Sequence, residues 1–322
     1  MIGAKNVPLF DDEQRARVGT TYKQQGREKA IRLGLKIAGP RMQELVEQVD
    51  QLRFGPSANE EGSKQPDHVS REVLVYCARG GMRSESVSWL LDQADYKVTR
   101  LAGGYKSYRQ LTHQTFEKSW NIMALTGMTG SGKTRLLHEL AEAGEQVIDL
   151  EGLACHRGSA FGGIGQREQP STECFENQIF EKLITLNPQK RIWVEDESRS
   201  VGKCVVPQPF FEQLHSAPAL YIEISHEERL DFLVQEYGDL PVDDMVAAIN
   251  RIAKRLGGQN VNAAVQSLQD NEIRRCAEIL LAYYDKTYGV CREKNPRHDV
   301  QQLDLTGCNS EQRLSKVLAA VS

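Results

Sequence analysis

Residues 127–134, with the sequence GMTGSGKT, constrain the fold of this chain more than any other feature. An apolar run at 122–125 precedes them, and a helical pattern at 134–143 follows. A glycine-rich loop that ends in Gly-Lys-Thr between a strand and a helix is typical of phosphate-binding α/β proteins with a mostly parallel sheet. Its glycines let backbone N–H groups turn toward a phosphate, and the helix adds the positive end of its dipole. A glycine-rich turn that binds nothing is disfavoured because both flanks fit.

Two side chains of this loop are predicted to have different roles in binding phosphate and metal. Lys133 brings a positive charge to the terminal phosphates, and the hydroxyl of Thr134 is placed to bind Mg²⁺. We expect Asp196, after the apolar run at 191–195, to support the metal. Asp149 and Glu151 are competing candidates for this role. The alternative is that these carboxylates only hydrate the end of a strand. The loop predicts binding of a di- or triphosphate, not its hydrolysis. The predicted diphosphate- or nucleotide-binding residues are Gly127, Thr129, Gly130, Ser131, Gly132, Lys133, Thr134 and Asp196, of which Thr134 and Asp196 would hold the metal.

A second candidate anion site lies at residues 77–84, CARGGMRS, which follow an apolar strand pattern and open a helix. A cysteine in this position meets backbone N–H groups and the helix dipole, which stabilise its thiolate. A buried structural cysteine is the alternative. The spacing of Cys77 and Arg83 is shared by cysteine phosphatases and some rhodanese-like domains, and Tyr76, where phosphatases often carry His, favours sulfur-group transfer. The predicted catalytic residues are Cys77, Arg79, Gly80, Gly81 and Arg83.

Short apolar runs that alternate with helical patterns divide the chain into two α/β series. The series meet at residues 112–121, so we predict one domain at 1–115 and a P-loop domain at 116–322. A helical appendage or lid is expected at about 241–288, with a break around Gly257 and Gly258. The polar segment 57–68 reads as a surface loop. The expected strands are 73–76, 96–101, 121–126, 146–150, 191–195, 219–224 and 300–305, and a helix is expected at 84–93.

Composition excludes several classes of protein. The 322 residues suit two domains, and a 40% apolar content excludes a mainly disordered chain. No run approaches the ~18 apolar residues of a membrane-spanning helix, and no secretory leader is visible, so we expect a cytoplasmic protein without a membrane partner. Seven cysteines without close spacing suggest reduced thiols. The net charge of −4, with the acidic excess after residue 120, argues against broad nucleic-acid binding.

The two loops and several exact strings together resemble the bacterial tRNA 2-selenouridine synthase family, in which a rhodanese-like domain precedes a P-loop domain. The resemblance covers nearly the whole chain. Beside the two loops, the strings that carry it are YKQQG at 22–26, GGYK at 103–106, DLEGLACHRG at 149–158, SAFG at 159–162 and EDESR at 195–199.

This resemblance implies a transferase that acts on tRNA carrying 2-thiouridine at the wobble position. The family exchanges the sulfur for selenium from selenophosphate, which selenophosphate synthetase supplies, and it is associated with S-geranylation of the same base from geranyl diphosphate. Cys77 would then handle the selenium or sulfur group. The phosphate loop would hold the diphosphate of the prenyl donor or a nucleotide, and Mg²⁺ is the one cofactor to consider, without a tightly bound one.

Rhodanese-like domains usually begin with an Asp-Val-Arg-type strand and a Gly-His-Ile-Pro-Gly turn. The first eight residues, MIGAKNVP, are similar to the end of that turn. The resemblance therefore implies a shortened first domain without its first strand and helix, and we expect a lost strand to expose a sheet edge beside the Cys77 loop.

Several basic or polar residues are candidates for contact with tRNA or substrate. His156 and Arg157 follow an acidic strand end, and Arg251, Lys254 and Arg255 recur along a predicted helix at 246–256. A hydrated loop and a hydrated charged face are the alternatives. The candidate tRNA or substrate contacts are His156, Arg157, Arg199, Lys254 and Arg255.

Two other functions stay open at this point. One is a P-loop kinase for a small molecule with a regulatory rhodanese-like domain, which would transfer the γ-phosphate of ATP without tRNA. The other is a non-catalytic tRNA-binding scaffold, in which the Cys77 thiol would have an ordinary pKa.

Overall fold

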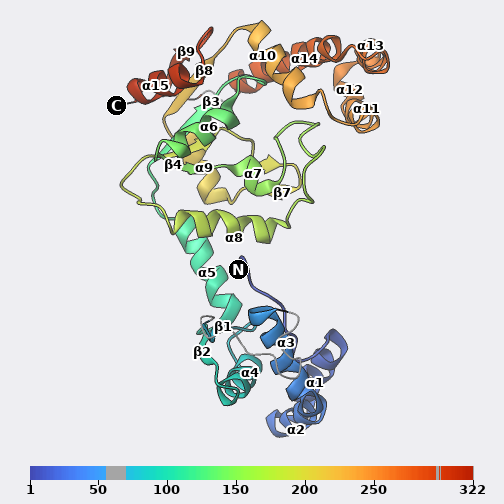
Figure 1. Cartoon of the computed structure of the whole chain (residues 1–322), viewed down its shortest axis with the longest axis vertical. Coiled ribbons are helices and arrows are strands. Elements are labelled where there is room, and N and C mark those ends of the chain that lie inside the picture. Colours follow the sequence, from blue (N-terminus) through green and yellow to red (C-terminus); the bar gives the residue numbers. More distant parts are fainter. Residues whose placement is uncertain (56–69, 295–296, 298, 322) are drawn as a thin grey trace. The chain divides into compact units, whose positions relative to one another are not determined.

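The computed structural model describes residues 1–55, 70–294, 297 and 299–321. The chain divides into two compact units, Met1–Leu111 and Thr112–Ser322, called here the first and second units. The division falls within helix α5 (Gly104–Phe116) (Figure 1). The segment predicted as a surface loop at 57–68 lies outside the described residues.

The first unit combines helices with a two-stranded parallel sheet, in which Glu72 of one strand pairs with Lys97 of the other. A small core of Val49, Leu91 and Tyr96 packs against the sheet. The strands and the helix α4 agree with the sequence prediction, whereas the three helices before residue 55 were not predicted. The elements are α1 (Asp12–Gln25), α2 (Arg27–Ala38), η1 (Gly39–Arg41), α3 (Met42–Phe54), β1 (Glu72–Val75), α4 (Met82–Gln93) and β2 (Lys97–Arg100).

The second unit is built on a parallel five-stranded sheet with the order β4-β5-β3-β8-β9. All five strands lie where the sequence predicts them, so an α/β chain with parallel sheets is confirmed. The strands are β3 (Ile122–Thr126), β4 (Gln146–Ile148), β5 (Ile192–Glu195), β8 (Ala219–Glu223) and β9 (Val300–Asp304). The helices of this unit are α6 (Lys133–Glu142), α7 (Leu150–Ala154), α8 (Thr172–Leu183), α9 (Gln208–Ser216), α10 (His226–Tyr237), α11 (Val242–Arg251), α12 (Ala253–Leu256), α13 (Gly258–Gln269), α14 (Ile273–Lys294) and α15 (Ser310–Ala320).

Strand β3 lies in the middle of this sheet, with β5 on one side and β8 on the other. Because the connections leave in opposite directions at this point, the carboxyl end of β3 is where an open parallel sheet forms a ligand crevice. The position of β3 thus places residues 127–134 at the centre of that edge.

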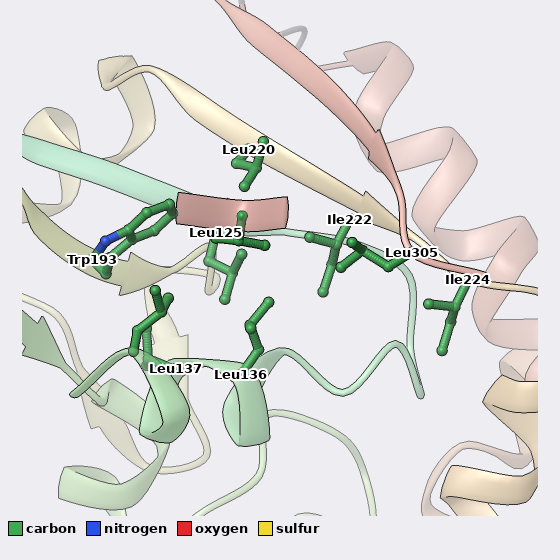
Figure 2. Packing of buried hydrophobic residues seen from close by; sticks show 10 residues of the cluster. Leu125, Leu136, Leu137, Trp193, Leu220, Ile222, Ile224 and Leu305 are labelled. Atoms are coloured by element: carbon green, nitrogen blue, oxygen red, sulfur yellow. The ribbon is translucent and has the colours of Figure 1, made fainter. Parts of the chain in front are cut away.

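The core of the second unit is formed where α6 packs on the sheet. Figure 2 shows Leu136 and Leu137 of α6 beside Leu125 of β3 and Trp193 of β5. The Trp193 side chain is fully buried, and its indole N–H donates to Glu145 Oε2 at 2.9 Å, so its polar atom is satisfied. This packing holds the start of α6, and with it the loop before it, against the sheet.

Helices α11 to α14 form the predicted helical appendage, in which α13 packs on α11 and α14, and α14 packs on α10 (Figure 1). The chain breaks at Gly257, as predicted, but also at Ile252 and before α14. Asn271 takes a left-handed φ of 61° at the last break, a conformation that asparagine tolerates. The prediction of one continuous helix over 246–256 is therefore wrong.

A short antiparallel hairpin, β6 (Ser200–Val201) and β7 (Cys204–Val205), was not predicted because two-residue strands carry no periodic pattern. Within the part of the chain that the structure describes, no helix has the length and apolar character needed to cross a bilayer.

Candidate functional site

The phosphate loop follows β3 and ends where α6 begins at Lys133. Gly130 has a φ of +78°, and a Cβ there would lie 2.8 Å from the Arg229 carbonyl oxygen, so glycine is required. Arg229, on α10, donates to the Thr129 carbonyl at 2.9 Å and forms an ion pair with Asp285 of α14. Helices α10 and α14 thereby hold the backbone of the loop.

Two polar side chains of the loop, Lys133 and Ser131, differ in their hydrogen bonds. Lys133 Nζ donates to the carbonyl oxygens of Gly127, at 2.8 Å, and Met128, at 3.3 Å. Ser131 is only 3% exposed, and its hydroxyl has no hydrogen-bond partner among the described residues. An unpaired buried hydroxyl is costly, so its presence in this loop fits a ligand that bonds it.

Glu151, at the start of α7, bonds Thr134, the threonine predicted to bind Mg²⁺. Thr134 Oγ1 donates to Glu151 Oε2 at 3.1 Å, and the Glu151 backbone N–H donates to Glu195 Oε1 at 2.7 Å. Burial, followed by the charge of Glu197, raises the pKa of Glu151 to about 8, although Lys133 and Thr134 act in the opposite direction. Burial likewise raises the pKa of Glu197 and of Glu195. The site therefore concentrates buried carboxyl groups beside the phosphate loop.

Asp196, the residue predicted to support the metal, lies in an ion pair. Its carboxylate forms an ion pair with Arg297, whose side chain is 8% exposed and also donates to the Leu214 carbonyl at 2.9 Å. Glu151, the competing candidate, is the acid that bonds Thr134. The sequence did not separate the two because both follow strands that end at the same edge of the sheet.

The donor set beside Thr134 suits Mg²⁺, which prefers oxygen ligands. Within the described residues, no group of three or more His, Cys, Asp and Glu side chains could hold a metal by itself. Mg²⁺ commonly binds through one or two carboxylates together with substrate phosphates, and a hydroxyl with one adjacent carboxylate fits that pattern.

The Cys77 loop connects β1 to α4, whose N-cap is Gly81. Cys77 Sγ lies 3.3 Å from Ser84 Oγ, and the same hydroxyl is 3.0 Å from the Gly81 carbonyl oxygen. Burial opposes ionisation of the thiol, but hydrogen bonds from Ser84 and from backbone N–H groups of Arg79, Ser84 and Gly81 outweigh it and lower the pKa of Cys77 to about 7. The lowered pKa favours the thiolate form of Cys77 near neutral pH.

The backbone of residues 103–106, GGYK, contacts the backbone of the Cys77 loop. Gly104 has a φ of +63°, and a Cβ there would lie 2.2 Å from the Cys77 carbonyl oxygen. The N–H of Tyr105 donates to that oxygen at 2.9 Å, and the N–H of Lys106 donates to the Ala78 carbonyl at 3.0 Å. Only glycine permits this close approach of two backbones.

Other predicted site residues vary in position. Arg79 is exposed and Arg83 is half-buried in the Cys77 loop, whereas Arg199, Lys254 and Arg255 are exposed on the second unit. The structure therefore places Lys254 and Arg255 together on α12, away from any buried site.

His156 and Arg157 follow α7 directly, and the His156 backbone N–H donates to the Glu151 backbone carbonyl oxygen at 3.0 Å. A Cβ on Gly158 would be 2.5 Å from Glu151 Oε1. His156 Nδ1 and one Nη of Arg157 are buried without a hydrogen-bond partner among the described residues. Burial, followed by the charge of Arg251, lowers the pKa of His156.

Two arginines of the helical appendage bond to groups of the protein itself. Arg251 donates to the Ala160 carbonyl at 2.9 Å, and Arg274 pairs with Glu227 and Asp231. Because the helix breaks at Ile252, Arg251 does not share a helix with Lys254 and Arg255, contrary to the sequence analysis.

Sequence reasoning missed Ser84 and Arg229. Ser84 is the last residue of the string at 77–84. Its position in the first turn of the helix after the cysteine could have indicated that its hydroxyl lies near the thiol. Arg229 lies within an ordinary amphipathic helix, so no local pattern marks it; its 5% exposure appears only in the tertiary structure.

The fold and the two loops define an α/β protein with a P-loop unit and a separate unit that carries a low-pKa cysteine. Residues 120–310 match the family described as tRNA 2-selenouridine synthase AAA domain. The chain belongs to the tRNA 2-selenouridine synthase family.

Three relatives, each named tRNA 2-selenouridine synthase, are similar to this chain. The protein of Aeromonas salmonicida is 39% identical over 72% of this chain and 59% of its own length. That of Nitrosomonas europaea is 38% identical over 73% of this chain and 59% of its own length. That of Nitrosomonas eutropha is 31% identical over 89% of this chain and 83% of its own length. The chain thus spans about three fifths of the first two relatives.

Proposed function

We propose that this chain is a transferase that replaces the sulfur of 2-thiouridine in tRNA, at the wobble position, with selenium. The proposal is supported by the family to which the chain belongs and by the names of its relatives. One observation carries the proposal: this chain contains two loops suited to binding anions. The first loop has a cysteine with a pKa of about 7, and the second has Lys133 and Thr134 in position to bind phosphate. Neither the kinase nor the scaffold receives support from the relatives.

In the first reaction, the phosphate loop holds the diphosphate of geranyl diphosphate, and a nucleotide is the other ligand that the loop would accept. The sulfur of 2-thiouridine attacks C1 of the geranyl group, so that an S–C bond forms, the C–O bond breaks and pyrophosphate leaves with the electron pair. Lys133, the Ser131 hydroxyl and the backbone N–H groups of the loop neutralise the charge on that leaving group.

Thr134 and Glu151 would hold Mg²⁺ at this site, and Asp196 would support the site through its ion pair with Arg297. When bound, the ion supplies positive charge to the departing pyrophosphate. His156 and Arg157, which directly follow α7, are the proposed contacts to the substrate tRNA, and Arg199, Lys254 and Arg255 would add outer contacts to its backbone.

In the second reaction, selenium from selenophosphate attacks C2 of the geranylated base. The C2–Se bond forms, the C2–S bond breaks and geranylthiolate leaves, while water cleaves the Se–P bond and releases phosphate. We assign the first unit, as a rhodanese-like domain, to this step, because the N–H groups that bond Cys77 form a cradle for a tetrahedral oxyanion. Cys77, Arg79 and Arg83 would orient selenophosphate, which selenophosphate synthetase supplies.

Nucleoside mass analysis tests the proposal. The full chain is incubated with tRNA that contains 2-thiouridine, with geranyl diphosphate alone, with selenophosphate alone and with both. We expect the geranylated nucleoside with the first addition and the selenated nucleoside with both. If no modified nucleoside forms while ATP is consumed without tRNA, the kinase replaces this proposal.

A further inference from the structure

Two hollows border the phosphate loop, and their linings differ. One begins at Ser131 and Gly132, has a volume of about 290 Å³ and is lined largely by charged and polar side chains. The other begins at Thr129 and is enclosed by α10, α11, α14 and the segment around Phe161. The charged lining side chains of the first hollow are Arg135, Glu139, Glu228, Asp231 and Arg313. The apolar lining side chains of the second hollow are Phe161, Leu233, Met245, Ile273, Ala277, Leu280 and Leu281.

Most hydroxyl groups that border the apolar hollow are bonded within the protein. Thr129 and Ser159 lie on its border, and the Ser159 side chain hydrogen-bonds both the Tyr237 and Tyr284 hydroxyls. The Tyr284 hydroxyl also accepts from the Ala160 N–H at 3.3 Å. With these hydroxyls engaged by the protein, the hollow presents mainly carbon atoms to a ligand.

The apolar hollow is narrow. Its open space is about 30 Å³, room for only a few water molecules. Leu233, Met245, Leu280 and Leu281 are all buried side chains of its lining, and Met245 is the unbranched, adaptable one among them. The open space is smaller than a ten-carbon chain, so we expect Met245 and its neighbours to move aside when such a chain enters.

We propose that this apolar hollow receives the hydrocarbon chain of a prenyl diphosphate whose diphosphate lies in residues 127–134. The inference rests on the proposed function, to which it adds the site that selects the alkyl group. The charged hollow is the wrong environment for such a chain, because burying hydrocarbon against charged groups would remove their hydration without replacing it. Each methylene in the apolar hollow should strengthen binding by about fourfold.

Calorimetric titration of the full chain with Mg²⁺ and two probes, inorganic pyrophosphate and geranyl diphosphate, tests this site. Ala277→Phe fills the apolar hollow, and Gln235→Phe, on the exposed border of the charged hollow, is the matched control. We expect Ala277→Phe to weaken geranyl diphosphate binding at least tenfold and to leave pyrophosphate binding unchanged. Gln235→Phe should leave both unchanged.

A second variant keeps the inference testable if the Ala277→Phe protein does not fold. Met245→Ala widens the hollow, so the affinity for farnesyl diphosphate relative to geranyl diphosphate should rise at least fivefold. Loss of geranyl diphosphate binding in Gln235→Phe alone would place the chain in the charged hollow and overturn the inference. So would equal affinity of the unaltered protein for pyrophosphate and geranyl diphosphate. Failure to bind either probe would instead remove the proposed function, and the inference with it.

Discussion

Burial opposes ionisation of both Cys77 and Glu151, yet their pKa values move in opposite directions. The Cys77 thiolate receives hydrogen bonds from Ser84 and from the start of α4, which lower its pKa to about 7. Burial, followed by the charge of Glu197, raises the pKa of Glu151 to about 8. Deeper burial and a neighbouring carboxyl group therefore decide the direction of the shift at Glu151, whereas hydrogen-bond donors decide it at Cys77.

The reactivity of Cys77 should follow this pKa. Because the value lies below the ordinary 9.0, the thiolate is populated above about pH 7 and is lost as the pH falls through 7. Alkylation by iodoacetamide, followed by peptide mass mapping, should reach half its maximal rate near pH 7. Cys276, whose pKa burial raises to about 11, serves as the internal control and should stay unlabelled.

Ser84→Ala removes the hydroxyl donor and should shift the alkylation midpoint of Cys77 upward by roughly one pH unit. A midpoint that stays in place would mean that the backbone N–H groups alone stabilise the thiolate.

The two candidate metal-supporting acids should respond differently to neutralisation. Glu151→Gln should lower the geranylation rate at least tenfold, because an amide cannot supply the carboxylate that would hold Mg²⁺ beside Thr134. Asp196→Asn leaves the buried Arg297 charge without its counter-charge and should cost about 2 kcal/mol of unfolding free energy with the rate largely kept. Initial rates and thermal unfolding of both variants separate the roles. The reverse pattern would restore Asp196 as the metal-supporting acid.

At the scale of elements, both loops join a parallel strand to a helix, and each depends on glycines where another segment approaches closely. Gly130 approaches the Arg229 carbonyl on α10, and Gly104 approaches the Cys77 carbonyl. These contacts join segments that are far apart in the sequence, so local patterns predict the loops but not what holds them.

Gly104→Ala should disrupt the Cys77 loop, because the new Cβ would lie 2.2 Å from the Cys77 carbonyl oxygen in a left-handed conformation. We expect a loss of about 2–4 kcal/mol in stability and a Cys77 alkylation midpoint closer to pH 9. Gly81→Ala is the matched control, since no atom lies within 4 Å of its Cβ position and its φ is −94°. Equal behaviour of the two variants would argue against the role of Gly104.

At the scale of the whole molecule, each unit carries one of the two loops that we predict to bind anions, so the two proposed reactions should be separable. Cys77→Ala should abolish selenation and leave geranylation largely intact, whereas Lys133→Ala should reduce geranylation at least tenfold, because pyrophosphate then leaves without that charge. Nucleoside mass analysis measures both products. Full selenation by Cys77→Ala would show that Cys77 does not serve the second reaction.

The sequence was sufficient for the periodic parts of the fold. Every strand of the five-stranded sheet lies within two residues of its prediction, because buried parallel strands are short apolar runs that local pattern reveals. Helix α1 has no buried residue, so it carries no apolar stripe and was not predicted. The split of the 246–256 helix at Ile252 was missed for a similar reason, since no glycine or proline marks it.

The amino-acid sequence by itself determined the two anion loops, the parallel α/β class and the family, because glycine spacing, strand–loop–helix order and exact strings are properties of adjacent residues. Only the tertiary structure decided that Glu151 and not Asp196 bonds Thr134, that Ser84 and Gly104 support Cys77, and that Arg229 holds the phosphate loop. Each of these contacts joins side chains or backbones that the sheet and its helices bring together, and hydrogen bonding and pKa depend on that distance in space.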